Sequence, residues 1–225
     1  MITNSSKKKI QQIINVFETG SIDGKYGTIS KYKDGPNGIK QITYGRSQTT
    51  EFGNLKRLVE LYIQKGGTNA AGLVKYVSKI GKQPSLVTDE IFISLLKDSG
   101  NNDPIMKECQ DEFFDSYYYH PALIWFEGYG FKEPLSLLVI YDSFIHSGGV
   151  KDYLRQRFPE RPPKFGGDEK KWIAQYVDVR HLWLKNHKRK ILNGTIYRTQ
   201  CFKNQIKNDN WDLKSPVIAN GLKVE

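Results

Sequence analysis

The fold is decided near the start of the chain, where residues 5–44 read SSKKKIQQIINVFETGSIDGKYGTISKYKDGPNGIKQITY. The first part of this stretch has the period of a helix, because four apolar residues from Ile10 to Phe17 follow the i, i+3, i+4, i+7 spacing of one helical face. We expect a helix over residues 5–17, capped by Ser5 or Ser6 and stopped at Gly20.

The second part of the stretch has the features of a hairpin. Residues 28–32 and 39–44 are two short β-prone runs, and the turn formers Asp34-Gly35-Pro36-Asn37-Gly38 separate them. The sequence therefore predicts a small hairpin or three-stranded sheet directly after the first helix.

Helical periods dominate the rest of the chain. Apolar faces recur over residues 55–63 and 73–80, and we expect further helices near 88–98, 103–119, 121–130, 134–147, 169–192 and 197–208. Residues 159–167 are rich in proline and glycine, which is typical of a surface loop. The predicted fold class is α+β and mainly helical.

Length and composition set the broad class of protein. A chain of 225 residues with 38% hydrophobic residues fits one domain, or one domain with two lobes. The net charge of +10 favours anionic partners such as nucleic acid, teichoic-acid-bearing walls or acidic lipid. The sequence contains no zinc-finger spacing, RNP-like motif or basic-region heptad, so we expect no nucleic-acid partner.

Other features of the sequence exclude several kinds of site. Cys109 and Cys201 have no metal-ligand spacing, and whether they pair is left open. We expect no metal and no cofactor. No apolar run is long enough to span a membrane, and the polar start is not a signal peptide, so we expect no membrane insertion. An extracellular site of action would require a signal removed earlier or release at lysis.

Two carboxylates near the start are candidates for acid and base chemistry. Glu18 follows the first helix, and the macrodipole at that end disfavours a negative charge. Asp34 lies in the turn of the predicted hairpin. Glycoside hydrolysis needs one carboxylic acid to protonate the leaving oxygen and a second carboxylate to activate water. Taken alone, however, Glu18 is more typical of a surface residue after a helix, and Asp34 of an ordinary turn former.

Several motifs in order resemble one family. Glu18 is followed by Lys25-Tyr26-Gly27, Asp34-Gly35, Gly38 and Thr43; downstream lie Tyr118-Tyr119-His120-Pro121-Ala122, the run LSLLVIYDSFIHSGG of residues 135–149 with its pair Tyr141-Asp142, the segments 176–180 and 197–199, and Asn210-Trp211-Asp212-Leu213. Together they resemble the family 46 chitosanases, which are related to phage and goose-type lysozymes. The resemblance covers most of the chain and implies a two-lobed lysozyme-like fold, with residues 1–225 forming a single catalytic domain and the cleft lying between the lobes.

The resemblance also implies roles for individual residues. Glu18 corresponds to the general acid, Asp34 to the general base, and Thr43 to the hydroxyl that helps to hold the attacking water. This is inverting chemistry, which requires the two carboxyl groups to stand roughly 6.5–9.5 Å apart. A buried network that orients the acid corresponds to Asp142, Arg180 and Arg198, although a structural salt bridge would explain the same three residues.

Two departures from the family pattern concern the base and the substrate. The interval between Asp34 and Thr43 is longer than in the family, and Asp23 is the nearest alternative to Asp34 as the general base. Asn54 falls where chitosanases place an aspartate that recognises the free amine, and an amide suits an N-acetyl group or lactyl ether as well as an ammonium. Asn54 and Tyr26 are the expected substrate contacts.

The sequence therefore predicts an endo-acting glycoside hydrolase that cleaves β-1,4 linkages of an amino-sugar polysaccharide of the chitosan type. We expect a monomer that acts outside the cell or is released at lysis. One alternative is a peptidoglycan-cleaving, muramidase-like phage lysin, which Asn54 and the basic surface would suit. Another is a noncatalytic wall-binding protein that retains the fold.

Overall fold

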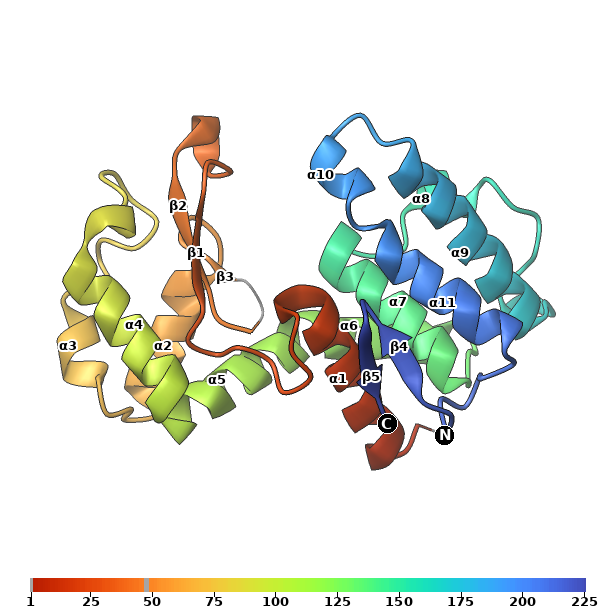
Figure 1. Cartoon of the computed structure of the whole chain (residues 1–225), viewed down its shortest axis with the longest axis horizontal. Coiled ribbons are helices and arrows are strands. Elements are labelled where there is room, and N and C mark those ends of the chain that lie inside the picture. The colour runs from red at the N-terminus through yellow and green to blue at the C-terminus, as the bar shows by residue number, and fades with distance from the viewer. Residues whose placement is uncertain (1, 47–48) are drawn as a thin grey trace. The chain divides into compact units, whose positions relative to one another are not determined.

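The computed structural model describes residues 2–46 and 49–225 and divides the chain into two compact units (Figure 1). The first unit combines residues 1–23 with 116–225, and the second is residues 24–115. Because the chain leaves the first unit after its opening helix and returns for the second half, segments distant in sequence meet there.

The first unit is a group of helices around α7. Its elements are α1 (Asn4–Thr19), α6 (His120–Gly128), α7 (Pro134–Ser147), α8 (Asp152–Arg155), α9 (Glu169–Lys185), α10 (Lys190–Asn193), α11 (Ile196–Lys207), the 3-10 turn Pro163–Phe165, and the strands β4 (Val217–Ala219) and β5 (Leu222–Val224). Helices α1, α6, α9 and α11 all contact α7, and α9 packs along α11 (Figure 1). Nine consecutive residues of α7, from Leu135 to Ser143, are buried, which makes it the central helix of this unit.

Helix α1 shows how the local sequence produces this arrangement. Its apolar face is completely buried, with Ile10, Ile13 and Ile14 all 0% exposed. The helix ends at Gly20, which adopts the left-handed conformation (φ 65°) that glycine tolerates without strain. The expected cap was wrong: Thr3 is the N-cap, and its hydroxyl accepts the amide hydrogen bond of Ser6.

The second unit contains the small sheet and a helical layer. Its elements are β1 (Ile29–Tyr32), the 3-10 turn Pro36–Gly38, β2 (Gln41–Tyr44), β3 (Thr49–Thr50), α2 (Leu55–Gln64), α3 (Ala70–Val74), the 3-10 turn Leu86–Thr88, α4 (Glu90–Asn102) and α5 (Pro104–Phe114). The sheet is antiparallel with strand order β1-β2-β3, and Ile42 of β2 pairs with Lys31 of β1. All four residues of β2 are buried, so this strand anchors the sheet on the unit.

The α+β, mainly helical fold class with a small three-stranded sheet near the N-terminus is confirmed. Helix α7 has the expected bounds, with Pro134 in its first turn, and the side chain of Asp168 caps α9 by accepting the amide hydrogen of Lys171. One long helix over residues 169–192 was wrong, because α9 ends at Lys185 and α10 begins at Lys190. The C-terminal hairpin β4–β5 was not predicted.

The structure also describes the two cysteines and shows whether helices could span a membrane or side chains could bind a metal. Cys109 and Cys201 are both free and buried, and burial raises the pKa of their thiols to about 11 and about 12. Among residues 2–46 and 49–225, no helix is long and apolar enough to cross a membrane. Within the same described residues, no group of three His, Cys, Asp or Glu side chains could hold a metal ion.

The contact between α4 and the loop before β1 gives a test of the second unit. A Cβ at Gly100 would lie 2.3 Å from the carbonyl oxygen of Tyr26 and 2.6 Å from Cα of Gly27. Because both obstacles are backbone, we expect Gly100→Ala to lower the free energy of unfolding by about 1–3 kcal/mol. Chemical denaturation measures this effect.

The matched control is Gly128→Ala at the end of α6, where an added Cβ meets nothing within 4 Å. We expect this variant to be neutral or more stable by about 0.4–1 kcal/mol. Equal stability of the two variants would show that α4 does not pack closely on residues 26 and 27.

Candidate active site

Glu18 lies in the last turn of α1, and its side chain is largely enclosed. The carboxylate is 13% exposed. Arg198 of α11 donates from Nη2 to Glu18 Oε1 at 2.5 Å and to the carbonyl oxygen of Phe17 at 3.3 Å. One guanidinium therefore fixes both the side chain of Glu18 and the backbone that precedes it.

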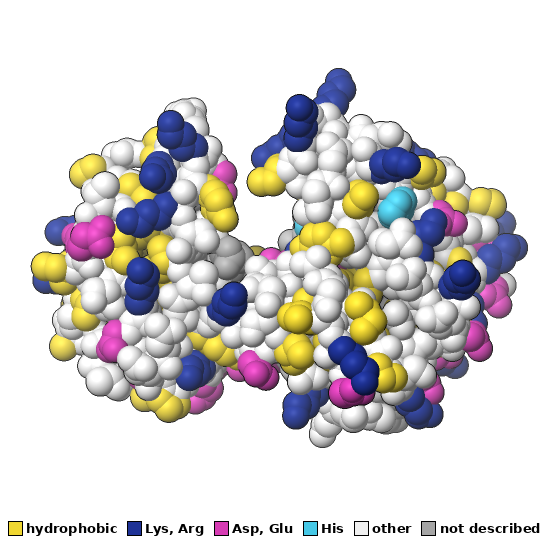
Figure 2. Space-filling view, in the orientation of Figure 1, with side chains coloured by type: hydrophobic (Ala, Val, Ile, Leu, Met, Phe, Trp, Pro, Cys, Tyr) yellow, Lys and Arg dark blue, Asp and Glu magenta, His cyan; other side chains and the backbone are white. Residues whose placement is uncertain are grey.

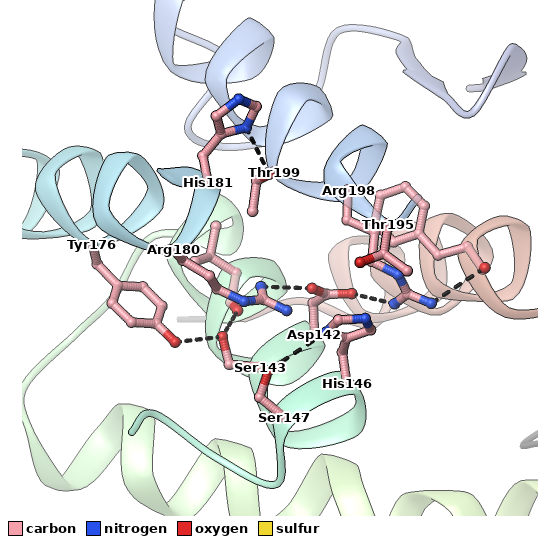
Figure 3. A network of polar contacts seen from close by, with 12 residues as sticks. Asp142, Ser143, His146, Ser147, Tyr176, Arg180, His181, Thr195, Arg198 and Thr199 are labelled. Carbon is pink, nitrogen blue, oxygen red and sulfur yellow. Dashed lines mark hydrogen bonds and ion pairs between the residues drawn. The ribbon is translucent and has the colours of Figure 1, made fainter. Parts of the chain in front are cut away.

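The contact with Arg198 continues into a buried chain of charges (Figure 3). Arg198 Nη1 donates to Asp142 Oδ1 at 2.7 Å, and Arg180 Nη1 lies 2.7 Å from Asp142 Oδ2. Asp142 and Arg180 are both completely buried. The second contact is close in distance but is poorly aligned as a hydrogen bond. The structure thus brings Glu18 together with all three predicted network residues, one from each of α7, α9 and α11.

The charges in this chain stabilise one another. Burial disfavours the ionised form of Asp142, but the charges of Arg180 and Arg198 outweigh it, so the pKa of Asp142 is lowered. Burial also opposes the charge of Arg198, whereas the carboxylates of Glu18 and Asp142 raise its pKa above the ordinary value. Both partners therefore remain charged, as expected for buried ions that are paired.

Aromatic rings hold the guanidinium of Arg198 in place. Its Cζ lies 5.3 Å from the ring centroid of Phe17 and 5.8 Å from that of Tyr197. The hydroxyl of Tyr197 donates to the carbonyl oxygen of Phe17 at 2.9 Å. Burial and the nearby charge of Glu18 raise the pKa of Tyr118, which places this tyrosine in the same environment.

Sequence reasoning missed the residues that support Asp142 from the other side. His146 lies beside Asp142 one turn later on α7 (Figure 3), and burial lowers the pKa of its imidazole to about 4 despite the opposing charge of Asp142. Tyr176 donates to Ser143 Oγ at 2.9 Å. The i+4 spacing of Asp142 and His146 was the available signal for this cluster.

Asp34 lies in the second unit, in the connection between β1 and β2. Its side chain is exposed, and Oδ1 accepts a hydrogen bond from Gln41 Nε2 at 3.0 Å. Gln41 is 4% exposed, and its Oε1 accepts the amide hydrogen of Phe52 at 3.1 Å. The buried end of β2 therefore tethers the exposed carboxylate.

Thr43 follows Gln41 by two residues on β2. Successive side chains alternate across a strand, so Gln41 and Thr43 lie on the same face. Thr43 is 4% exposed, and among the described residues its Oγ1 has no hydrogen-bond partner. A hydrogen bond joins Asp34 to Gln41, and Thr43 lies on the same face of the strand with its hydroxyl oxygen buried.

The two expected substrate contacts also belong to the second unit. The hydroxyl of Tyr26 donates to Asp111 Oδ1 at 2.9 Å, and Arg46 forms an ion pair with the same oxygen. Asn54 is half-buried at the N-cap of α2, where its side chain makes no capping hydrogen bond. Tyr26 is therefore fixed by protein partners, whereas the amide of Asn54 is not used to cap its helix.

Comparison with known proteins defines the family of this chain. The model of Glycosyl hydrolase family 46 matches residues 12–217. The chain belongs to this family. As a member of Glycosyl hydrolase family 46, it is a glycoside hydrolase, as the sequence predicted.

Individual family 46 proteins resemble the chain over nearly its whole length. It is 29% identical to a chitosanase of Bacillus subtilis (strain 168), over 96% of this chain and 82% of the relative. A mutant chitosanase from Bacillus subtilis MY002, solved in complex with 6 GlcN, is 25% identical with a TM-score of 0.81 and full coverage of both chains. A family 46 chitosanase from Gynuella sunshinyii with chitotetraose shares the fold, with a TM-score of 0.81 at 20% identity over 99% of this chain and 98% of its own.

The buried charge chain of this family 46 enzyme predicts a large stability effect. Asp142→Asn would leave two buried guanidinium groups without their carboxylate, so we expect the free energy of unfolding to fall by roughly 3–5 kcal/mol. Because the folded-state pKa of Asp142 is lowered from 3.8, its stabilisation is present above that pH and is lost as the pH falls through the folded value. Denaturation at neutral and acidic pH measures both effects.

The control is Asp178→Asn, which removes an ion pair with Lys203 on the surface of the same unit. The carboxylate of Asp178 is 59% exposed, so we expect a change of about 1 kcal/mol or less. Losses of similar size in the two variants would contradict the structural importance of the Asp142 chain.

Proposed function

We propose that this enzyme is an endo-acting, inverting chitosanase in which Glu18 is the general acid and Asp34 the general base. The observation that carries the proposal is the continuous contact from Glu18 through Arg198 and Asp142 to Arg180. Support also comes from the named family 46 relatives, whose solved complexes contain GlcN oligomers or chitotetraose. Cleavage is at β-1,4 linkages of the polysaccharide.

The surroundings of Glu18 suit a residue that donates a proton to a leaving oxygen. After the transfer, Glu18 carries a negative charge within a largely enclosed site. Arg198 already contacts Oε1, so a cation stabilises this charge without reorganisation. Asp142 holds Arg198 from its other side, which limits the rotation of the guanidinium. Oriented in this way, the acid keeps one position through the catalytic cycle.

The surroundings of Asp34 suit a residue that accepts a proton from water. The carboxylate is exposed, and Gln41 restrains one of its oxygens. Thr43, on the same face of β2 as Gln41, is the residue proposed to hold the attacking water; its Oγ1 is buried and has no hydrogen-bond partner among the described residues. Inverting hydrolysis needs room for this water between base and sugar.

The substrate contacts proposed for this enzyme are Asn54 and Tyr26. Asn54 provides both a donor and an acceptor but no charge, so it binds an acetamido group as readily as a glucosamine amine. The amide and the net charge of +10 also favour the second candidate function, cleavage of peptidoglycan. Lys and Arg side chains occur over the visible face of each unit (Figure 2). We further propose action as a monomer outside the cell or after lysis.

Two substitutions test the catalytic assignments. Glu18→Gln keeps the size and the contact with Arg198 but removes the acidic proton, and we expect at least a 100-fold loss of turnover on a glucosamine hexamer. Asp34→Asn keeps the oxygen that accepts from Gln41 but removes the base, and we expect a loss of roughly 100- to 10,000-fold. Reducing-end release measures both rates, and circular dichroism checks that the variants are folded.

The matched controls are a Glu→Gln and an Asp→Asn substitution at residues outside the proposed catalytic pair. Glu127→Gln alters an exposed residue of α6, and Asp23→Asn alters the nearest rival for the base; both should retain wild-type turnover. If Asp23→Asn loses activity and Asp34→Asn does not, the base is Asp23. If a folded Glu18→Gln variant remains fully active, the acid assignment is wrong.

Product analysis tests the substrate and the stereochemistry together. We expect cleavage of a glucosamine hexamer with initial release of the α-anomer, because single displacement inverts a β-linkage. Proton NMR of the first products detects the anomer. Clearing of bacterial walls without cleavage of the hexamer would instead establish the peptidoglycan-cleaving function, and initial release of the β-anomer would exclude inversion.

A further inference from the structure

A pocket of the first unit shares no residue with the Glu18–Arg198–Asp142 chain. It has a volume of about 460 Å³, within the range of roughly 300–1,000 Å³ that is common for small-molecule sites. Residues from α6, α8, the 163–165 turn and α9 line it. The pocket is therefore large enough to hold a ligand of its own.

Three aromatic rings give the pocket an apolar surface. The ring centroids of Trp125 and Tyr129 are 4.4 Å apart, and Phe165 meets Tyr129 edge-on at 6.2 Å. Phe165 is 57% exposed although it is a large apolar residue. Aromatic faces of this kind pack against the C–H groups on the flat side of a pyranose ring. The rings therefore offer a stacking surface for a sugar.

Trp172 lies behind these rings and has a buried hydrogen-bond donor with no partner among the described residues. It lines the pocket and is 0% exposed, and its ring packs against Phe131, Phe158 and Tyr176. Among the described residues, no acceptor lies within hydrogen-bond reach of its Nε1–H. A buried indole N–H usually has a partner.

The charges around the pocket indicate what kind of sugar it takes. Asp152 is the one lining carboxylate, whereas Arg155 and Arg161 supply two guanidinium groups. Arg155 already donates to the carbonyl oxygens of Phe158 and Glu160, at 2.8 and 2.6 Å. The excess of positive charge opposes an ammonium group and permits an uncharged one. An acetamido group suits this lining, because it is uncharged and has both a carbonyl that an arginine can bind and an N–H that a carboxylate can accept.

We infer that this pocket binds an N-acetylglucosamine unit, and so recognises acetylated stretches of a partly acetylated chain. This inference rests on the proposed function in one respect, namely that the substrate is an amino-sugar polysaccharide. Binding in this pocket would hold an acetylated stretch of the polymer on the enzyme. Glucosamine linkages in other parts of the same polymer would meanwhile be cleaved at the catalytic site.

NMR of the tryptophan side chains tests the inference directly. The chain has four tryptophans, so the indole N–H signals of Trp125 and Trp172 are separable from those of Trp183 and Trp211. In full-length, ¹⁵N-labelled Glu18→Gln protein, we expect a tetramer of N-acetylglucosamine to shift the first two signals saturably and the other two little. The glucosamine tetramer should shift them at least tenfold more weakly at equal concentration.

Substitution of an exposed pocket residue supplies the matched comparison. We expect Phe165→Ala to weaken binding of the acetylated tetramer at least tenfold, and Tyr153→Ala, an exposed aromatic outside the pocket, to leave it unchanged. With Glu18 intact, Phe165→Ala should hydrolyse a glucosamine hexamer at the wild-type rate. This hydrolysis tests the proposed function independently of the pocket.

Three results would overturn the inference. The first is no movement of the Trp125 and Trp172 signals up to the solubility limit of the acetylated tetramer. The second is movement that survives Phe165→Ala unchanged. The third is equal or stronger binding of the glucosamine tetramer, which would refute recognition of the acetyl group.

Discussion

The structure of the first unit depends on one buried carboxylate. Asp142 is completely buried between Arg180 and Arg198, and these three residues belong to α7, α9 and α11. A buried charge is stable only when its partners are in place, so these helices can pack in few other arrangements without exposing or stranding an ion. The same charges continue to Glu18 at the end of α1. The same buried ion pairs therefore determine both how these helices pack and how the proposed acid is oriented.

Regular elements were predictable where a local signal reports burial or capping. Helix α7 has Pro134 in its first turn and a continuous apolar run, and it ends before Gly148, which adopts the left-handed conformation (φ 67°) of a helix C-cap. At the break after α9, the side-chain amide of Asn193 donates to the carbonyl oxygens of Leu184, Lys185 and His187, which takes the place of continued helix at that end. Hydrophobic periodicity contains no information about such a side chain. The strands β4 and β5, three residues each, are likewise too short to show a period.

The candidate site was predictable only in part for a related reason. Glu18 and Arg198 are 180 residues apart, and nothing in the spacing of either residue predicts their contact. The family resemblance identified both residues as members of the site, and the structure shows the contact between them. No resemblance or motif indicated the bond between Asp34 and Gln41, because it depends on how the longer connection from Asp34 to Thr43 folds back onto β2. The significance of His146 comes from its burial near Asp142, which the sequence alone does not show.

The two proposed catalytic carboxylates differ in how firmly the protein holds them. Glu18 is enclosed and bound by a guanidinium that is itself held by a buried carboxylate and two aromatic rings. Asp34 is exposed and restrained by a single side-chain hydrogen bond, so it keeps more of its rotational freedom. A proton donor must stay aligned with one oxygen of the sugar, whereas a base that acts through water tolerates a wider range of positions, because the water can adjust. The tighter support of Glu18 is thus what the proposed division of roles requires. The longer connection between Asp34 and Thr43 therefore affects the proposed base, whose position needs to be less precise than that of the proposed acid.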